Sequence, residues 1–399
     1  MKKLICLFLC LATVFCFGGC KGKSTNGVST VTSSSAQSIV QSSDSSSSEI
    51  TSSETEPVSN LSLEDKISRL FLVKPETLNL DSSGHIVSEA ITKMNPRIIS
   101  ALQKYKVSGV ILFDKNIVNE NGLKNFTCEL QKTASLPLFI SIDEEGGNVS
   151  RLANHKNLAV DNVGFPINFK TTENVKRAYE SITKYLVNYG FNLNFAPVAD
   201  VFTNPKNTVI GSRAFGKDPE TVSSLLVAAI EGHKKLPHCV KHFPGHGDTT
   251  EDTHNGSVKI DKTWEELLKC ELIPFKTAIE QNCDMIMTSH IILPHVTKEK
   301  LPTSLSYELV TEKLRKELGF NGVVITDSFV MDAITENYSS GDAAVLAIKA
   351  GVDIILCPAN LVEAHTAVLN AVKKGEISEE RIDESIKRID ALFEKYNIK

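Results

Sequence analysis

The sequence predicts an α/β protein with one folded domain, a single (β/α)8 barrel of the TIM type. A signal peptide and a disordered Ser-rich tether are expected to precede it. Three observations lead to this prediction. Short apolar runs recur after residue 61, stretches of helical character separate them, and polar residues stand where the runs end. Repeated strand–helix units are typical of a parallel sheet with right-handed crossovers.

The first 20 residues have the pattern of a bacterial export signal. Lys2 and Lys3 come before an apolar stretch that ends at Phe17, and two glycines then stand directly before Cys20. The stretch is too short for an ordinary spanning helix. Small residues before a cysteine resemble the lipobox of lipoproteins, although Phe17 stands where leucine is usual. We expect a lipid on Cys20; a plain secreted protein or an uncleaved anchor is the alternative.

Residues 21–60 are expected to form a disordered linker. The segment is rich in serine and threonine and has almost no large apolar side chains. Such a composition cannot bury enough apolar surface to fold, so the segment is interpreted as a flexible tether. The remaining residues, 61–399, show no second break in composition and are predicted to be one folded domain.

Eight apolar runs are the candidate strands. Several are apolar throughout, as parallel strands covered on both faces are. They are RLFLV (69–73), GVILF (109–113), PLFISI (137–142), FNLNFAPV (191–198), HCVKHF (238–243), DMIMTS (284–289), GVVITD (322–327) and DIILC (353–357).

Helices are predicted between these runs, and eight strand–helix units fit a barrel of this length. The candidate helices are 173–189, 219–235, 264–281, 306–318 and 341–350. A doubly wound open sheet is the alternative architecture. It is disfavoured in its dinucleotide-binding form because no G-x-G-x-x-G follows the first strand.

Polar residues stand at the ends of several predicted strands. Asp143, Asp200, His290 and Asp327 each follow an apolar run, and Lys241-His242 lies near the end of another. In a barrel these strand ends converge on one face, where the active sites of this fold lie. Any one of them can instead be a helix cap or a loop contact, but together they predict a site.

Composition excludes several classes of function. The formal charge is −5 and no long basic run follows the first residues, so nucleic acid is not expected as a partner. The five cysteines beyond the signal segment are scattered and form no C-x-x-C pair. They therefore predict neither a disulfide framework nor a thiolate zinc site.

The stretch KHFPGHGDTTEDTH (241–254) concentrates titratable groups where a proline and two glycines prevent a regular helix. Two interpretations compete. A histidine close to an aspartate, such as His254 and Asp252, can act as an acid/base pair. His242, His246, Asp248 and His254 have the ligand types of a zinc site, but their spacing matches no H-E-x-x-H helix, and the proline and glycines argue against a fixed ligand geometry. We therefore expect no metal and no cofactor.

Three further segments carry candidate site residues. DEEGGNVSR (143–151) offers Asp143 and Arg151 for hydroxyl groups, and GSRAFG (211–216) offers Arg213 in a loop. In ITDSFVMDAI (325–334), Asp327 is either a helix N-cap or a nucleophile. A carboxylate that attacks an anomeric carbon divides one difficult displacement into two easier steps.

Together these segments resemble glycoside hydrolase family 3, in particular its bacterial β-N-acetylhexosaminidases. KHFPGHGDTTEDTH is similar to the family's K-H-F-P-G-H-G-D-T-x-x-D-S-H, with Thr253 for serine. DEEGGNVSR resembles D-Q-E-G-G-R-V-x-R, with Asn148 in place of an arginine, and the other two segments match in order. The resemblance covers residues 61–395.

The resemblance implies a retaining mechanism in which Asp327 is the nucleophile and His254, with Asp252 as its partner, is the acid/base. It also implies that sugar hydroxyls are held by Asp143, Arg151, Arg213, Lys241 and His242, with Asp200 and His290 as further lining residues. The chain ends soon after the eighth unit, so we expect the Asp-Thr-His loop, and not a further domain, to supply the acid. That loop favours N-acetylglucosamine over glucose.

The expected function is therefore a retaining exo-β-N-acetylglucosaminidase outside the cytoplasmic membrane, lipid-anchored at Cys20 or secreted. Its expected substrates are peptidoglycan fragments or chitooligosaccharides. A neutral histidine base would not repel phosphate, so phosphorolysis stays open beside hydrolysis. The alternatives are a β-glucosidase of the same family, a metal-dependent hydrolase and a non-catalytic sugar-binding lipoprotein.

Overall fold

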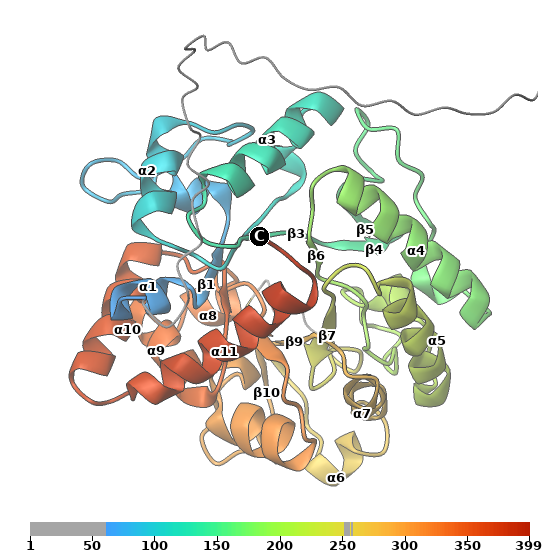
Figure 1. The fold of residues 1–399 in the computed structure, drawn as a ribbon. Coiled ribbons are helices and arrows are strands. Elements are labelled where there is room, and N and C mark those ends of the chain that lie inside the picture. Colours follow the sequence, from blue (N-terminus) through green and yellow to red (C-terminus); the bar gives the residue numbers. More distant parts are fainter. Residues whose placement is uncertain (1–60, 251–255, 257) are drawn as a thin grey trace, which may run out of the picture. The chain divides into compact units, whose positions relative to one another are not determined.

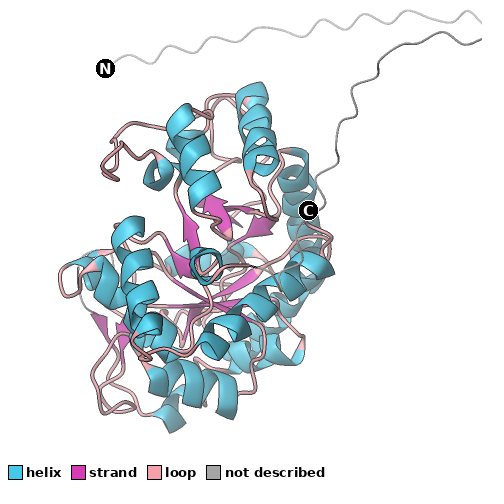
Figure 2. Ribbon diagram, turned by 60° about the vertical axis from the view of Figure 1, so that its left-hand side comes forward, coloured by secondary structure: helices cyan, strands magenta, loops and turns pink. Residues whose placement is uncertain are grey.

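The computed structural model describes residues 61–250, 256 and 258–399. The predicted signal peptide, Cys20 and the predicted tether therefore lie outside the described residues. Helices and strands alternate through the described part, with the strands at the centre and the helices around them (Figures 1 and 2). This confirms the predicted α/β class.

All eight predicted apolar runs contain a strand. These strands are β1 (Phe71–Val73), β2 (Gly109–Ile111), β3 (Phe139–Ile142), β6 (Leu193–Asn194), β7 (Cys239–Phe243), β9 (Met285–Thr288), β11 (Val323–Thr326) and β12 (Ile355–Leu356). Every residue in them is buried, which agrees with runs that are apolar throughout.

The eight strands pair in parallel within two sheets, with the orders β12-β1-β2-β3-β6 and β11-β9-β7. Isolated parallel bridges join residues near the sheet edges. Val198 pairs with Lys241 beside β6 and β7, and Ile325 pairs with Ile354 beside β11 and β12. Consecutive strands along the chain are thus neighbours in space, as repeated crossover units require.

Helices lie between the strands along the chain, and η8 (Glu308–Glu317) is π-helical. The α-helices are α1 (Leu63–Ser68), α2 (Pro96–Lys104), α3 (Glu120–Thr133), α4 (Thr172–Asn188), α5 (Pro219–Gly232), α6 (Trp264–Leu267), α7 (Ile273–Glu280), α8 (Asp332–Thr335), α9 (Ser340–Ala350), α10 (Leu361–Lys373) and α11 (Glu379–Lys395).

The long helices begin where the sequence provides a side-chain cap. Asn119, Thr171 and Asp218 each accept a hydrogen bond from a backbone N–H in the first turn of α3, α4 and α5. Those first-turn N–H groups have no partner within the helix, so such caps stabilise the start. Helix α9 ends at Gly351, whose φ of 109° is left-handed, as is common after a helix.

One predicted helix is wrong as a continuous element. The segment 264–281 divides into α6 and α7, and Pro274 lies in the first turn of α7. Proline has no N–H to donate and is best tolerated in a first turn, so it starts a new helix there. The predicted helix 306–318 is present, but as the π-helical η8.

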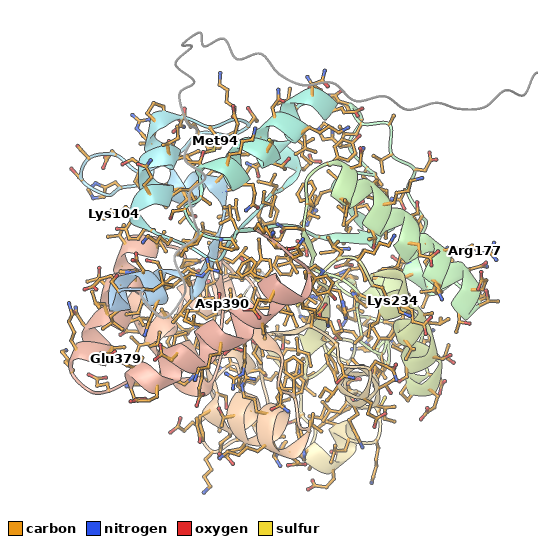
Figure 3. All side chains as sticks on the ribbon, viewed as in Figure 1. Met94, Lys104, Arg177, Lys234, Glu379 and Asp390 are labelled. Carbon is orange, nitrogen blue, oxygen red and sulfur yellow. The ribbon has the colours of Figure 1, made fainter. Side chains whose placement is uncertain are left out.

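Charged side chains cover the outer faces of the helices. Lys104, Arg177, Lys234 and Glu379 are exposed, and Figure 3 shows Lys104, Arg177 and Glu379 at the periphery of the view. Within residues 61–250, 256 and 258–399, every helix is too short or too polar to cross a bilayer.

A buried histidine makes the stability of the fold depend on pH. His233 is fully buried; Asn194 lies 3.0 Å from its Nε2, and the carbonyl of Ala229 lies 3.2 Å from its Nδ1. Burial, with the field of His238, lowers the pKa of His233 to about 3. The unfolded chain therefore binds a proton below about pH 6.5 that the folded chain does not, and stability falls as the pH falls from 6.5 towards 3.

We expect His233→Gln to remove this part of the pH dependence. Between pH 6.5 and 5 the wild type should lose about 2 kcal/mol more unfolding free energy than the variant does. Urea denaturation at several pH values measures the difference. His85→Gln is the matched control because His85 is exposed, and its profile should follow the wild type. Superposable profiles for His233→Gln and the wild type would contradict the prediction.

Candidate active site

A cavity of about 590 Å³ opens at the carboxyl ends of the strands. It contains Asp143 after β3, Lys241 and His242 on β7, and Asp327 after β11. These residues are far apart in the sequence, and the parallel strands bring them to one place. Arg151 and Arg213, which the sequence predicted as sugar ligands, also line this cavity.

Two predicted residues, Lys241 and Arg213, meet on the carboxylate of Glu145, which the prediction omitted. Lys241 Nζ lies 2.7 Å from Asp143 Oδ1 and 2.6 Å from Glu145 Oε1. Arg213 donates from Nε to Glu145 Oε2 and from Nη2 to Oε1, each at 2.8 Å. Charges of opposite sign therefore alternate along the cavity wall, and two cations share one buried carboxylate.

These contacts control the ionisation of Glu145 and Lys241. Burial by itself would raise the pKa of Glu145, but the charges of Arg213 and Lys241 outweigh it and hold that pKa well below its usual range. Burial would lower the pKa of Lys241, whereas Asp143 and Glu145 raise it overall. Glu145 and Lys241 are therefore both ionised throughout the physiological pH range.

A second buried carboxylate orients His242. Asp200 Oδ2 lies 2.7 Å from His242 Nδ1, and Asp200 Oδ1 accepts from the backbone N–H of His246 at 2.6 Å. Arg213 Nη2, which can only donate, lies 3.3 Å from His242 Nε2. The ring is thus held with Nδ1 as donor and Nε2 as acceptor, which fixes its orientation in the wall.

The carboxylate of Asp327 is placed so that it can contact a ligand in the cavity as an anion. Its Oδ1 accepts from the backbone N–H of Ser328 at 2.7 Å, and within the described residues no cation forms an ion pair with it. Burial would raise its pKa, but the fields of His242 and His290 and the Ser328 hydrogen bond lower it overall. His290 lies nearby, with Nε2 3.1 Å from the carbonyl of Ser328.

Arg151 reaches the cavity from the short hairpin of β4 (Glu144–Gly146) and β5 (Val149–Ser150). Its guanidinium lies 5.9 Å from the ring centre of Phe113, and its buried Nε has no hydrogen-bond partner in the described part of the chain. A donor without an acceptor beside a cavity suits a ligand oxygen. Asn148 is exposed and does not line the cavity.

The hairpin is held by Glu144, the neighbour of Glu145. Glu144 accepts from the N–H groups of Leu152 and Ala153, at 2.8 and 3.2 Å, and from the hydroxyl of Tyr185 at 3.0 Å. Gly146 has a φ of 101°, and a Cβ there would lie 2.7 Å from the carbonyl oxygen of Gly164. This glycine therefore permits a close approach between two backbone segments.

The segment that follows β7 is only partly described. Asp252 and His254, the predicted acid/base pair, lie outside the described residues. Before them, Asp248 accepts from Thr203 at 2.8 Å and pairs with Lys262 at 3.0 Å. Gly247 packs so closely that a Cβ would lie 1.8 Å from the carbonyl oxygen of Val201. Contacts within the protein therefore explain the residue types at Asp248 and Gly247 without a bound ligand.

The metal interpretation gains no support from the described candidate ligands. His242 and His246 line the cavity, but the carboxylate of Asp248 is engaged elsewhere. In the part of the chain that the structure describes, no three His, Cys, Asp or Glu side chains are grouped as metal ligands. His254, the fourth candidate, is not described.

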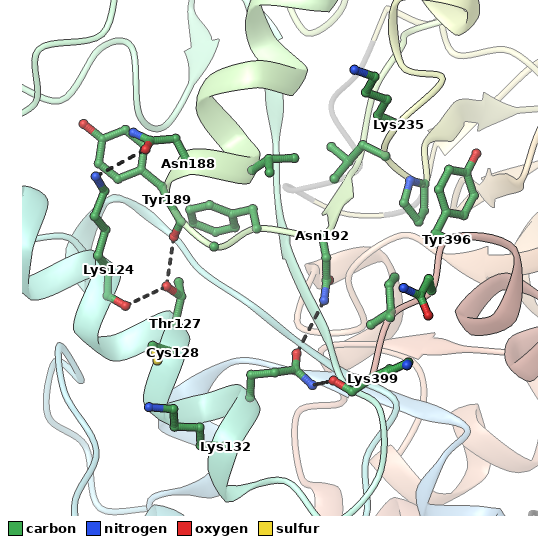
Figure 4. A pocket seen from close by; sticks show the side chains of 18 residues that line it. Lys124, Thr127, Cys128, Lys132, Asn188, Tyr189, Asn192, Lys235, Tyr396 and Lys399 are labelled. Atoms are coloured by element: carbon green, nitrogen blue, oxygen red, sulfur yellow. Dashed lines mark hydrogen bonds between the residues drawn. The ribbon is translucent and has the colours of Figure 1, made fainter. Parts of the chain in front are cut away.

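Another hollow, of about 640 Å³, lies at the opposite ends of the strands (Figure 4). Lys124, Lys132, Lys235 and Lys399 line it together with the apolar side chain of Phe191. Of these lysines, Lys132 lies in the last turn of α3, where it compensates the negative end of the helix dipole. Among the described residues that line this hollow there is no aspartate, glutamate or histidine to match Asp327 and His242, and its exposed thiol, Cys128, has no histidine beside it in that lining.

The prediction missed Glu145 although it lies within the quoted segment DEEGGNVSR. It also missed Lys74, which follows β1, and Phe113, which follows β2; both line the cavity. Lys74 and Phe113 stand at strand ends, so the rule that found Asp143 could have found them. Glu145 carried no such signal, because Asp143 already marked the end of its strand.

Comparison with known proteins identifies the family. Residues 62–392 match the model of the glycosyl hydrolase family 3 N-terminal domain. A solved β-N-acetylglucosaminidase of that family from Paenibacillus sp. str. FPU-7 superposes with a TM-score of 0.77 at 35% identity, over 85% of this chain and 63% of its own.

Two curated relatives are similar to this chain over most of its length. Beta-hexosaminidase A from Pseudoalteromonas piscicida is 32% identical over 77% of this chain, and an uncharacterized secreted glycosyl hydrolase from Arthroderma benhamiae is 33% identical over 72%. The chain spans 56% of the length of the first relative and 84% of the second. The predicted family is confirmed: the chain belongs to glycosyl hydrolase family 3.

Proposed function

We propose that the protein is a retaining exo-β-N-acetylglucosaminidase. The observation that carries the proposal is Asp327, an ionised carboxylate with no paired cation among the described residues. It lies in a cavity whose other wall is a fixed set of hydrogen-bond donors and acceptors. Such a wall suits sugar hydroxyls, and a free carboxylate opposite it suits attack on the anomeric carbon. The names of the hexosaminidase and glucosaminidase relatives support N-acetylglucosamine as the sugar.

In the proposed mechanism Asp327 attacks the anomeric carbon and forms a glycosyl ester. His254, with Asp252 as its partner, gives a proton to the leaving oxygen. The same ring then takes a proton from water, which attacks the ester and releases the sugar with its original configuration. Asp143, Arg151, Arg213, Lys241 and His242 hold the hydroxyls during both steps, with Asp200 orienting His242.

The remaining organisation is proposed from the sequence. We propose that the eight parallel strands act as one closed (β/α)8 barrel over residues 61–399, and the isolated bridges between the two sheets support this. Residues 1–20 are proposed as a signal peptide, Cys20 as the lipidated residue and 21–60 as the tether. An extracytoplasmic location is supported by the secreted relative, and it favours peptidoglycan fragments or chitooligosaccharides as substrates.

The test is an assay of the protein on 4-nitrophenyl β-N-acetylglucosaminide and 4-nitrophenyl β-glucoside. Cleavage of the first alone, with retained configuration in the first-formed sugar, supports the proposal. Faster cleavage of the glucoside would assign a β-glucosidase instead. Activity that is lost on chelation and restored by zinc would assign a metal-dependent hydrolase. A folded protein that binds the sugar and cleaves neither substrate would be a binding lipoprotein.

Phosphate distinguishes two versions of the same chemistry. If phosphate replaces water in the second step, the product is a sugar 1-phosphate, and its amount rises with phosphate concentration. Hydrolysis gives free N-acetylglucosamine at a rate that phosphate does not change. Product analysis with and without phosphate therefore assigns the acceptor, whichever glycosyl ester forms first.

A further inference from the structure

We propose that Glu145 is a positioning residue of the sugar subsite: its charge and its two oxygens hold Arg213 and Lys241 in the geometry that receives the sugar. The inference rests on the proposed function, because it concerns the same cavity. Glu145 is fully buried, and the sequence-based prediction gave it no role.

Counting donors shows how completely Glu145 engages the two cations. Lysine has three N–H donors, and Lys241 uses one on Glu145 and one on Asp143. Arginine has five, and Arg213 directs two to Glu145, one to the carbonyl of Val209 at 3.1 Å and one towards His242. Each cation keeps one N–H for a ligand, and Glu145 therefore determines where that last donor lies.

Glutamine cannot replace Glu145 in this arrangement. Oε1 accepts from both Lys241 and Arg213, and Oε2 accepts from Arg213. Either orientation of an amide would place its NH₂ group against a guanidinium or an ammonium donor, where no acceptor is available. Aspartate keeps the charge, but it is shorter by one methylene and reaches both cations less well.

The charge of Glu145 also balances the cavity. Arg213 and Lys241 contact the Glu145 carboxylate directly, and the hydroxyl of Tyr179 from α4 donates to the Glu145 backbone carbonyl at 3.3 Å. The charged and titratable groups beyond these are Asp143, Asp200, His242 and Asp327. Neutralising Glu145 leaves one more uncompensated positive charge there. Acidic groups that act in catalysis then lose protons at lower pH.

A role limited to folding makes a different prediction. Asp353, at the opposite end of the barrel strands, is also fully buried and contacts Arg315 and Arg388. Asp353→Asn therefore has the same chemical change and a similar loss of ion pairs, away from the cavity. It should lower stability while leaving kcat/KM of the folded enzyme within about twofold of the wild type.

The experiment compares Glu145→Gln, Glu145→Asp and Asp353→Asn in the full chain. It measures kcat, KM and the pH profile of kcat/KM on 4-nitrophenyl β-N-acetylglucosaminide, and thermal stability. We expect Glu145→Gln to lose about a hundredfold or more in kcat/KM, since misplaced binding groups cost about that much. Both limbs of its pH profile should move to lower pH. Glu145→Asp should lose about tenfold, with the limbs unmoved, because the charge stays.

The outcomes separate the inference from the proposed function. An inactive wild type overturns the proposed function and this inference with it. If the wild type is active and Glu145→Gln has the same kinetics, the inference alone is overturned. The inference is also overturned if Glu145→Gln loses activity without a shift of its pH limbs and Asp353→Asn loses as much. Should Glu145→Gln fail to fold, Glu145→Asp decides: wild-type kcat/KM in that variant overturns the inference.

Discussion

Asp327→Asn is expected to lose about 10⁴-fold or more in kcat on 4-nitrophenyl β-N-acetylglucosaminide, as the loss of a nucleophile does in other enzymes. The amide is nearly the same size, and its oxygen can still accept from the Ser328 N–H. The change therefore removes the attacking charge and little else. Steady-state kinetics with a folded, monodisperse variant measures the loss.

A matched control lies five residues away. Asp332 is exposed in the first turn of α8 and does not line the cavity, so Asp332→Asn should keep kcat within about twofold. A further variant, Asp327→Ala, leaves space for a small anion. With azide it should form a glycosyl azide of inverted configuration, because azide then attacks from the side of the missing carboxylate. Asp327→Asn with near wild-type kcat would contradict the nucleophile assignment.

Asp353→Ala is expected to have the largest effect on stability. Asp353 is fully buried, lies 2.5 Å from Arg315 and 3.1 Å from Arg388, and accepts from the Ser385 hydroxyl and the Val324 N–H. Burial would raise its pKa, but the arginines lower it overall, so it is ionised in the folded protein. Removing one partner of a buried ion pair costs about 3–5 kcal/mol, because the cations left behind are uncompensated.

Urea denaturation at pH 7 measures this cost. The matched control is Glu312→Ala, which removes an exposed carboxylate 2.7 Å from Lys316 on η8. Exposed pairs contribute little, so this variant should stay within about 0.5 kcal/mol of the wild type. Equal midpoints for the two variants would show that Asp353 does not hold α11 and η8 to the strands.

The sequence predicted the strands better than the helices, for a physical reason. Runs buried on both faces need apolar residues at every position, so RLFLV and GVVITD are visible without any structure. Whether one proline divides a helix depends on the packing around it, which the sequence does not show. The division at Pro274 was therefore missed. The π-helical hydrogen bonds of η8 leave no separate residue pattern, and sequence alone does not distinguish them.

The candidate site was predicted where one residue marks one strand end, as Asp143 and Asp327 do. The contacts between the site residues were not predicted. The β7–β9 pairing shifts register between Lys241 and Phe243, and consecutive Lys241 and His242 both line the cavity. Regular alternation would send one of them away. The Glu145–Arg213 pair joins residues 68 positions apart, and no local spacing rule reports such a contact.

The adjacent carboxylates at positions 144 and 145 give the cavity two separately adjustable supports. Glu144 secures the loop that presents Arg151, whereas Glu145 secures Arg213 and Lys241 on the other wall. A single-codon change at 144 can therefore move Arg151 without moving Arg213 and Lys241, although all three are proposed to hold the sugar. In evolutionary terms, this hairpin lets selection adjust one sugar contact at a time.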